Sequence, residues 1–276
     1  MRTFLALLAA LAQAPTFSSR VDAVRVDVLV TDNGKPVPGL TRADFEILDN
    51  GVLQQVDVVS FDQVPLNVVL AFDMSSSVEG DRRERLLGGA DQLLAGLKRN
   101  DQAALVTFSH VVNRGTKLTG DLAAVKEALA RAEGIGDTAL VDGIFAGIMV
   151  GESDVGRGLL IVFSDGLDTS SWLAPASVLD ASRRSGVVAY AVSVKSRVRP
   201  AFLEELTSLT GGRLFEVERT QNLDAIFLAV LEEFRHRYLV SYTPRGVSRA
   251  GWHQLDVRVK NRRATVKARP GYLAAF

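Results

Sequence analysis

The chain has 276 residues, of which 47% are hydrophobic and 23% charged, so it can bury a core and does not have the composition of a disordered chain. Its 32 basic and 32 acidic residues balance to a formal net charge of zero, which gives no global electrostatic basis for binding nucleic acid or an acidic membrane surface. It contains no cysteine, which excludes disulfides, thiolate metal sites and cysteine nucleophiles. Two local basic segments, Arg235–Arg237 and Lys260–Arg263, are interpreted as solvated surface.

Residues 1–12 have the pattern of a short signal peptide. Arg2 precedes the apolar run Phe4–Ala12, and Ala10-Leu11-Ala12 is a suitable cleavage site. The run is too short to span a bilayer comfortably, and a buried N-terminal helix is the alternative. We expect an extracytoplasmic protein, periplasmic or secreted to the cell surface, with no membrane-spanning segment after cleavage.

Residues 20–63 have β character. Apolar residues alternate from Val24 to Val30, which is the period of a half-buried strand, and Asp32-Asn33-Gly34 then signals a turn. Phe45–Leu48 and Val56–Phe61 are two further short strands. We therefore predict three strands of a small sheet here.

Residues 64–235 alternate between buried strands and amphipathic helices, which predicts a mostly parallel central sheet flanked by helices. Continuous apolar runs are typical of strands covered on both faces. The predicted strands are Val68–Phe72, Ala103–Phe108, a short edge strand within Val111–Lys117, Leu159–Phe163, Val187–Val194 and Arg213–Val217. The predicted helices are Leu86–Leu97, Leu122–Arg131, Leu140–Val150, Ala176–Arg184, Phe202–Leu209 and Leu223–Phe234.

Residues 236–276 return to β character, with candidate strands at Tyr238–Tyr242, Leu255–Val259 and Thr265–Ala268. Three strands before the α/β unit and three after it are each too few to be stable alone. We predict that they pair into one small β-sandwich-like module into which the α/β domain is inserted. Two separate small appendages are the alternative.

Oxygen-bearing side chains collect where the predicted strands end. Asp73, Ser75 and Ser77 follow the first buried strand, Asp165 follows another, and Thr138 begins a loop-to-helix step. Ligands of open α/β sheets bind at the carboxyl ends of the strands, where the strand order reverses. If the order reverses between these two strands, three loops present two carboxylates and three hydroxyls to one point.

This set contains only hard oxygen donors, which suits Mg²⁺, Mn²⁺ or Ca²⁺ and disfavours zinc or copper. Three neutral hydroxyls and at most two carboxylates leave a divalent cation under-neutralised. A metal so held should take a further carboxylate from outside the chain. The predicted partner is therefore a protein that contributes an acidic side chain, and binding it requires no bond to break.

The pattern Asp73-x-Ser75-x-Ser77, followed by Thr138 and Asp165, resembles the metal-ion-dependent adhesion site of von Willebrand factor A domains. The resemblance extends from about Leu66 to Phe234. It implies a Rossmann-like fold in which the three hydroxyls approach the metal and the two aspartates act directly or through water.

The flanks resemble acidobacterial von Willebrand factor A-related proteins, a family that implies an exported bacterial setting. The resemblance rests on Val28–Thr41, Asp44–Glu46, Thr138–Asp142, Ser164–Ser171 and Ala268–Tyr272.

Several alternatives accompany this interpretation. Asp73 and the serines after it would also suit a helix N-cap. Asp137, Asp142 and Asp168 lie near the proposed ligands, and each is expected to be a helix cap or a surface acid that at most supports the ligands.

Two other functions use the same residues: metal-assisted hydrolysis, with Asp165 positioning a water, and a scaffold whose metal only stabilises a loop. His110 is the histidine nearest in sequence to the predicted rim, and it is expected to be a surface residue. The chain lacks a Gly-x-Ser-x-Gly elbow and a phosphate-binding loop with lysine, so we predict that it is not an enzyme. No heptad or sustained apolar stripe predicts an oligomeric state.

Overall fold

The computed structural model describes residues 23–153, 155–164, 167–195 and 198–274. The predicted signal peptide lies outside these residues, and so does Asp165. Within the described ranges, no helix is both long enough and apolar enough to cross a membrane.

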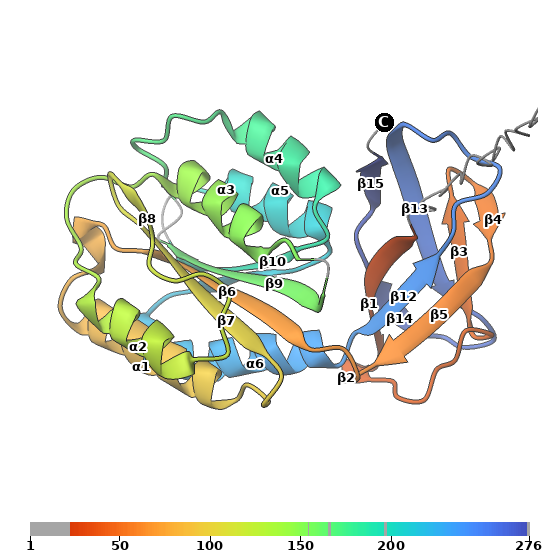
Figure 1. The fold of residues 1–276 in the computed structure, drawn as a ribbon, viewed down its shortest axis with the longest axis horizontal. Coiled ribbons are helices and arrows are strands. Elements are labelled where there is room, and N and C mark those ends of the chain that lie inside the picture. Colours follow the sequence, from red (N-terminus) through yellow and green to blue (C-terminus); the bar gives the residue numbers. More distant parts are fainter. Residues whose placement is uncertain (1–22, 154, 165–166, 196–197, 275–276) are drawn as a thin grey trace, which may run out of the picture.

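The middle of the chain forms an α/β domain whose strands are those that the apolar runs predict (Figure 1). Its six-stranded sheet has the order β11-β10-β9-β6-β7-β8, and every pairing in it is parallel except that of β7 with β8. The strands are β6 (Leu66–Asp73), β7 (Gln102–Phe108), β8 (Val112–Arg114), β9 (Arg157–Ser164), β10 (Val188–Val194) and β11 (Leu214–Val217). The α-helices are α1 (Asp81–Ala95), α2 (Leu122–Arg131), α3 (Leu140–Gly151), α4 (Pro175–Arg184), α5 (Ala201–Thr210) and α6 (Leu223–Arg235).

Strand β6 is the centre of this sheet. The chain passes from β6 to β7 on one side and later places β9 on the other side, so the strand order reverses between β6 and β9. The prediction that the three loops with the candidate ligands meet at one point required this reversal of strand order. The carboxyl ends of the parallel strands point away from the β module (Figure 1).

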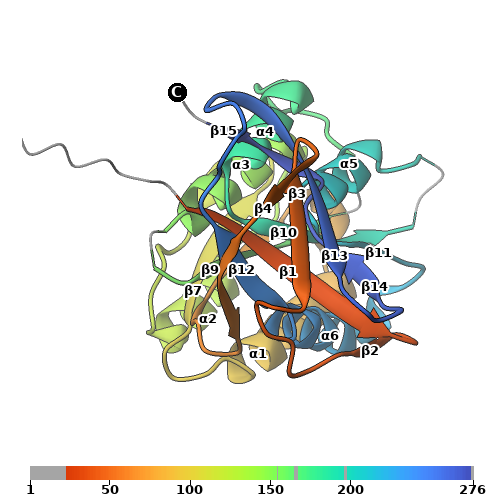
Figure 2. The same cartoon turned by 90° about the vertical axis from the view of Figure 1, so that its right-hand side faces the viewer.

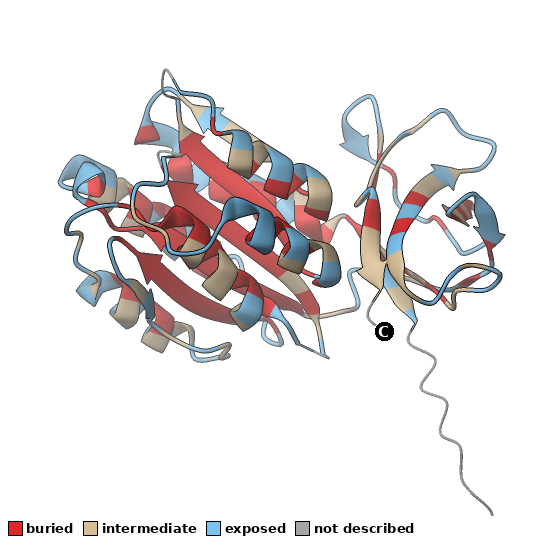
Figure 3. Cartoon of the chain, turned by 90° about the horizontal axis from the view of Figure 1, so that it is seen from above, coloured by how far each residue is buried: buried red, intermediate tan, exposed pale blue. Residues whose placement is uncertain are grey.

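The two faces of β6 pack against different helices, which explains why its sequence is apolar without alternation. Val68, Leu70 and Phe72 belong to a core cluster with α1, α2 and α6. Val69 and Ala71 belong to a second cluster with α3, α4 and α5. Figure 3 shows the central sheet as the most continuously buried part of the molecule.

The strands before and after the α/β domain form one two-sheet module, as predicted (Figures 1 and 2). One sheet has the order β14-β1-β12-β5, with β2 paired to β1, and the other has the order β15-β13-β3-β4. Because β12 lies between β1 and β5, the N-terminal strands complete their sheet only with a strand from the C-terminal segment. The strands are β1 (Val24–Asp32), β2 (Lys35–Pro36), β3 (Phe45–Asp49), β4 (Val52–Gln54), β5 (Val56–Phe61), β12 (Tyr238–Tyr242), β13 (Gly251–Val259), β14 (Thr265–Lys267) and β15 (Gly271–Ala274).

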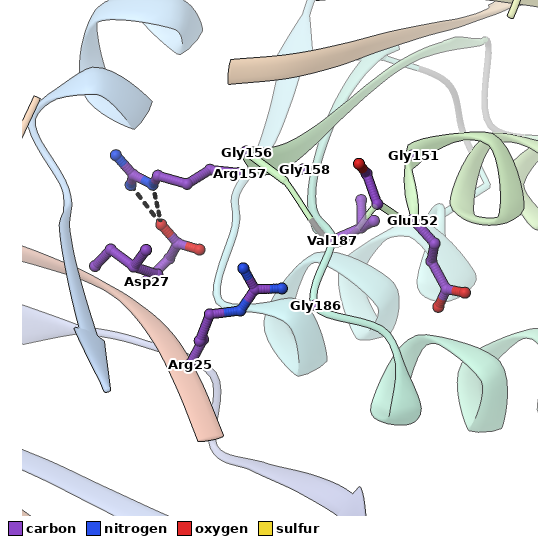
Figure 4. Close-up of a pocket in the computed structure, with 11 residues that line it drawn as sticks. Arg25, Asp27, Gly151, Glu152, Gly156, Arg157, Gly158, Gly186 and Val187 are labelled. Carbon is purple, nitrogen blue, oxygen red and sulfur yellow. Dashed lines mark hydrogen bonds and ion pairs between the residues drawn. The ribbon is translucent and has the colours of Figure 1, made fainter. Parts of the chain in front are cut away.

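A buried ion pair joins the module to the α/β domain. Arg157, at the start of β9, donates from Nε to Oδ1 of Asp27 on β1 at 2.7 Å, beside a cavity of about 370 Å³ (Figure 4). The two side chains are 2% and 8% exposed. The guanidinium of Arg157 also lies 4.7 Å from the ring centroid of Phe234 on α6.

The interpretation of Arg235–Arg237 as solvated surface is wrong. Arg237 is 0% exposed and donates to the hydroxyl of Tyr190 at 2.8 Å and to the carbonyl of Gly211 at 2.7 Å. Arg235 is also buried and donates to Asp101 at 2.7 Å. These arginines fix the end of α6, from which the chain continues into β12. The sequence alone did not show which groups accept their hydrogen bonds. Lys260–Arg263 is exposed, as expected.

Replacing Asp27 by alanine should destabilise the protein, because it leaves the buried guanidinium of Arg157 without its carboxylate. We expect the free energy of unfolding to fall by about 3 kcal/mol, measured by urea denaturation at neutral pH. The matched control is Asp256→Ala, which removes the exposed partner of Arg258 and should leave stability near the wild-type value. Equal stability of the two variants would contradict the role assigned to the Asp27–Arg157 pair.

Candidate metal centre

The carboxylate of Asp73 is fixed at the end of β6. The residue is 0% exposed, its Oδ1 accepts a hydrogen bond from the backbone N–H of Ser75 at 2.9 Å, and its Oδ2 accepts one from the hydroxyl of Ser164 at 2.7 Å. Ser164 ends the neighbouring strand β9, so these contacts bridge the point where the strand order reverses. A carboxylate oxygen has lone pairs enough for a further contact beyond each of these bonds.

Asp73 and the serines do not cap helix α1. That helix begins at Asp81, and its N-cap is Gly80, which has no side chain to offer. Ser75 precedes only a short 3₁₀ helix, Ser76–Val78, and makes no side-chain capping bond to it. The N-cap alternative for these residues is therefore wrong.

The hydroxyls of Ser75 and Ser77 lie side by side. Their Oγ atoms are 3.0 Å apart; Ser75 is 2% exposed, and Ser77 is exposed. Two neighbouring ligands of an octahedral Mg²⁺, each about 2.1 Å from the metal, are separated by about 3.0 Å. The spacing of these two oxygens therefore suits adjacent positions around one small divalent cation.

The loop that carries Thr138 packs directly against the Asp73–Ser77 loop. Gly136 donates its N–H to the hydroxyl of Ser76 at 2.9 Å, and the N–H of Ser76 donates to the carbonyl of Gly136 at 3.2 Å. A Cβ on Gly134 would lie 2.7 Å from the carbonyl oxygen of Met74, so this approach requires glycine. These contacts bring the buried Thr138 to the same edge as the serines.

The loop after β9 is tied to Thr138 in turn. The N–H of Thr138 donates to the hydroxyl of Thr169 at 2.9 Å, and the N–H of Thr169 donates to the carbonyl of Thr138, also at 2.9 Å. Ser164 and Thr169 stand on either side of Asp165 in the sequence. The structure thus connects the three loops that carry the predicted ligands, although Asp165 itself lies outside the described residues.

Asp142 and Asp168 brace these loops. Asp168 accepts from the N–H of Val141 in the first turn of α3 at 3.2 Å, and Asp142 accepts from the N–H groups of Trp172 and Leu173, both at 2.9 Å. Asp168 thus accepts from the start of a helix, whereas Asp142 holds loop residues that precede α4 and does not cap a helix. Asp137 is exposed.

Sequence reasoning gave no role to Ser164 or Thr169. Ser164 was visible as the polar end of an apolar strand, but its bond to Asp73 depends on the pairing of β9 with β6. Thr169 follows the motif and had no signal of its own.

Across the described residues, no group of three or more histidine, cysteine, aspartate or glutamate side chains is placed to hold a metal. The predicted donors within the described residues are the carboxylate of Asp73 and the hydroxyls of Ser75, Ser77 and Thr138.

The family comparison supports this architecture. The model described as von Willebrand factor type A domain matches residues 67–229, which is more than half of the chain. No curated protein sequence matches the chain.

Several solved structures share the fold. Proximal thread matrix protein 1 from the mussel byssus, with a zinc-occupied MIDAS motif, has a TM-score of 0.57 at 19% identity over 67% of this chain and 49% of its own. This chain thus spans about half the length of the mussel protein. A von Willebrand factor type A protein from Catenulispora acidiphila has a TM-score of 0.54 at 13% identity, over 94% of this chain and 76% of that one. An aerotolerance-related membrane protein from Bacteroides fragilis has a TM-score of 0.50 at 19% identity, over 61% of this chain and 98% of that one.

At these identities the likenesses concern the fold alone, and membership of the acidobacterial group stays a prediction. The family match covers the whole central sheet and the serine loop at its edge. The chain therefore belongs to the von Willebrand factor type A domain family.

Proposed function

We propose that this protein is a non-enzymatic binding protein that holds a carboxylate of a protein partner through a divalent cation. The proposed ligands are Asp73, Ser75, Ser77, Thr138 and Asp165. The observation that carries the proposal is the pair of serine hydroxyls, 3.0 Å apart, beside a wholly buried aspartate at the reversal of strand order.

The charge balance of the site supports recognition of an acid. Asp73 and Asp165 are the only charged members of the proposed ligand set, and the other three ligands are neutral hydroxyls. Mg²⁺ prefers six oxygen ligands, so coordination positions remain for water or an incoming carboxylate. An acidic side chain of a partner would complete both the coordination and the neutralisation.

His110 is the histidine that bears on the hydrolase alternative. The chain has three histidines, and His110 lies at the carboxyl edge of the central sheet. Its Nδ1 is hydrogen-bonded to the carbonyl of Ile135 at 3.0 Å. That bond anchors the histidine to the loop leading to Thr138. Because a carbonyl can only accept, Nδ1 is the donor in this bond and Nε2 of the exposed His110 can accept a proton, so the turnover assay below tests the hydrolase alternative.

The proposed setting is outside the cytoplasm, on the basis of the leader pattern in residues 1–12. The ion is proposed to be Mg²⁺, with Mn²⁺ or Ca²⁺ as alternatives. Because the mussel relative holds zinc in its MIDAS motif, zinc also belongs in any test of the metal.

Removing one hydroxyl should weaken metal binding without unfolding the protein. Ser77→Ala is expected to lower the affinity for Mg²⁺ by at least about tenfold, because an exposed oxygen ligand is lost while the core is untouched. Calorimetric titration with Mg²⁺, Mn²⁺, Ca²⁺ and Zn²⁺ measures this. Asp73→Asn should abolish binding.

The control for that titration is Ser153→Ala, which removes an exposed serine hydroxyl between α3 and β9 and should bind metal like the wild type. Unchanged Mg²⁺ affinity in both Ser77→Ala and Asp73→Asn would sink the site assignment.

Metal-loaded protein should show no turnover of generic phosphate monoesters or carboxylic esters, because the proposal assigns the metal to holding a carboxylate. The assay compares wild type with Asp73→Asn in excess Mg²⁺. Metal-dependent turnover that disappears in the variant would favour the hydrolase alternative.

Capture of a protein partner from an envelope or secreted fraction should depend on the metal. We expect retention to be lost in chelator, restored by Mg²⁺ and lost again with Ser77→Ala, because the ion bridges the two proteins. A partner retained equally in chelator would instead support a scaffold whose metal only stabilises a loop.

A further inference from the structure

Trp172 is the most exposed large hydrophobic residue that the structure describes, with 95% of its surface accessible. Trp172 lies after β9, in the loop whose Thr169 is hydrogen-bonded to Thr138. Its backbone is fixed, because its N–H and that of Leu173 both donate to the carboxylate of Asp142 at 2.9 Å. The loop therefore presents an indole to solvent from an anchored position.

Beside Trp172 lies a hollow of about 420 Å³. Its lining includes Val111, Phe145 and Leu173, together with His110 and Asp142. Both carboxylate oxygens of Asp142 accept backbone N–H groups, and Nδ1 of His110 is bonded to the carbonyl of Ile135. Because most of the lining residues are apolar, the hollow suits an uncharged, apolar side chain.

The hollow borders the loop that carries Thr138. Ala139 lines it, and the preceding residue is Thr138, a proposed metal ligand. The N–H of Ala139 donates to the carbonyl of Ser109 at 2.7 Å, which holds this short connection against the end of β7. A segment that places a carboxylate on the metal thus has the hollow within reach.

We infer that the partner recognised at this site is a protein segment that carries an aromatic or large aliphatic side chain close to its metal-binding carboxylate. The apolar side chain enters the hollow and packs against Trp172. This inference rests on the proposed function and specifies its partner. Exposed tryptophans that become buried on association are among the strongest contributors to protein interfaces.

The test uses labelled, capped glycine-rich peptides with one aspartate and a phenylalanine one, two or three residues later. Matched peptides carry alanine for phenylalanine, or asparagine for aspartate. Fluorescence anisotropy in Mg²⁺ measures affinity for the wild type. We expect the best aspartate–phenylalanine spacing to bind roughly tenfold more tightly than its alanine counterpart, as burial of an aromatic ring predicts.

Trp172→Ser should remove that advantage while leaving the affinity for Mg²⁺ and for the aspartate–alanine peptide unchanged. The matched control is Leu53→Ser, which changes another exposed apolar residue, on β4 of the β module, and should keep the advantage. Trp252→Phe leaves Trp172 as the sole tryptophan of the chain, and its emission should shift to the blue when the phenylalanine peptide binds.

Equal affinity for phenylalanine and alanine peptides at every spacing, or a full advantage retained in Trp172→Ser, would overturn the inference while leaving metal-dependent carboxylate binding intact. Failure of the proposed function looks different: aspartate and asparagine peptides would bind alike, with or without chelator. The proposed combination of a metal–carboxylate contact with an apolar contact would also be overturned if the phenylalanine peptides required Trp172 but bound equally well with asparagine in place of aspartate.

Discussion

The burial of Asp73 constrains the whole carboxyl edge of the central sheet. Burying a carboxylate removes its hydration, which destabilises the folded protein unless hydrogen bonds or opposite charges replace the water; Asp73 has no exposed surface. Here the compensation comes from the Ser75 backbone on the same loop and from the Ser164 hydroxyl on the next strand. Those bonds hold the β6 and β9 loops together, and the glycine contacts then dock the Thr138 loop onto them. These contacts fix the edge at which the divalent cation is proposed to bind.

The β module sits at the opposite end of the α/β domain. Its sheets interleave strands from both ends of the chain, so the α/β domain is an insertion whose two connections leave from the same side. Buried arginines at that junction, Arg157 and Arg237, bond to groups on several elements and hold the domains in a defined relation. The carboxyl edge is thereby left uncovered and directed away from the module (Figure 1).

Local patterns predicted the architecture well because most elements carry their own signal. The continuous apolar run of β6 and the helical spacing of α2 need no tertiary information, whereas the short strands β2, β4 and β15 exist mainly through pairing with neighbours. The bond from Ser164 to Asp73, the buried acceptors of Arg237 and the exposure of Trp172 all depend on residues distant in sequence. A motif can name ligands, but packing decides which supporting side chains reach them.

The proposed function requires the carboxyl edge of the sheet to distinguish among proteins that carry acidic side chains. A lone metal–carboxylate contact discriminates poorly, since acidic side chains are common on protein surfaces. Discrimination between partners is a difference of affinities, and a second contact that most acidic segments cannot make supplies that difference. The anchored Trp172 and the hollow lined by Ala139 would provide such a contact beside the proposed metal ligand Thr138. In this arrangement the cation would set the requirement for an acid, and the apolar hollow would select among the proteins that carry one.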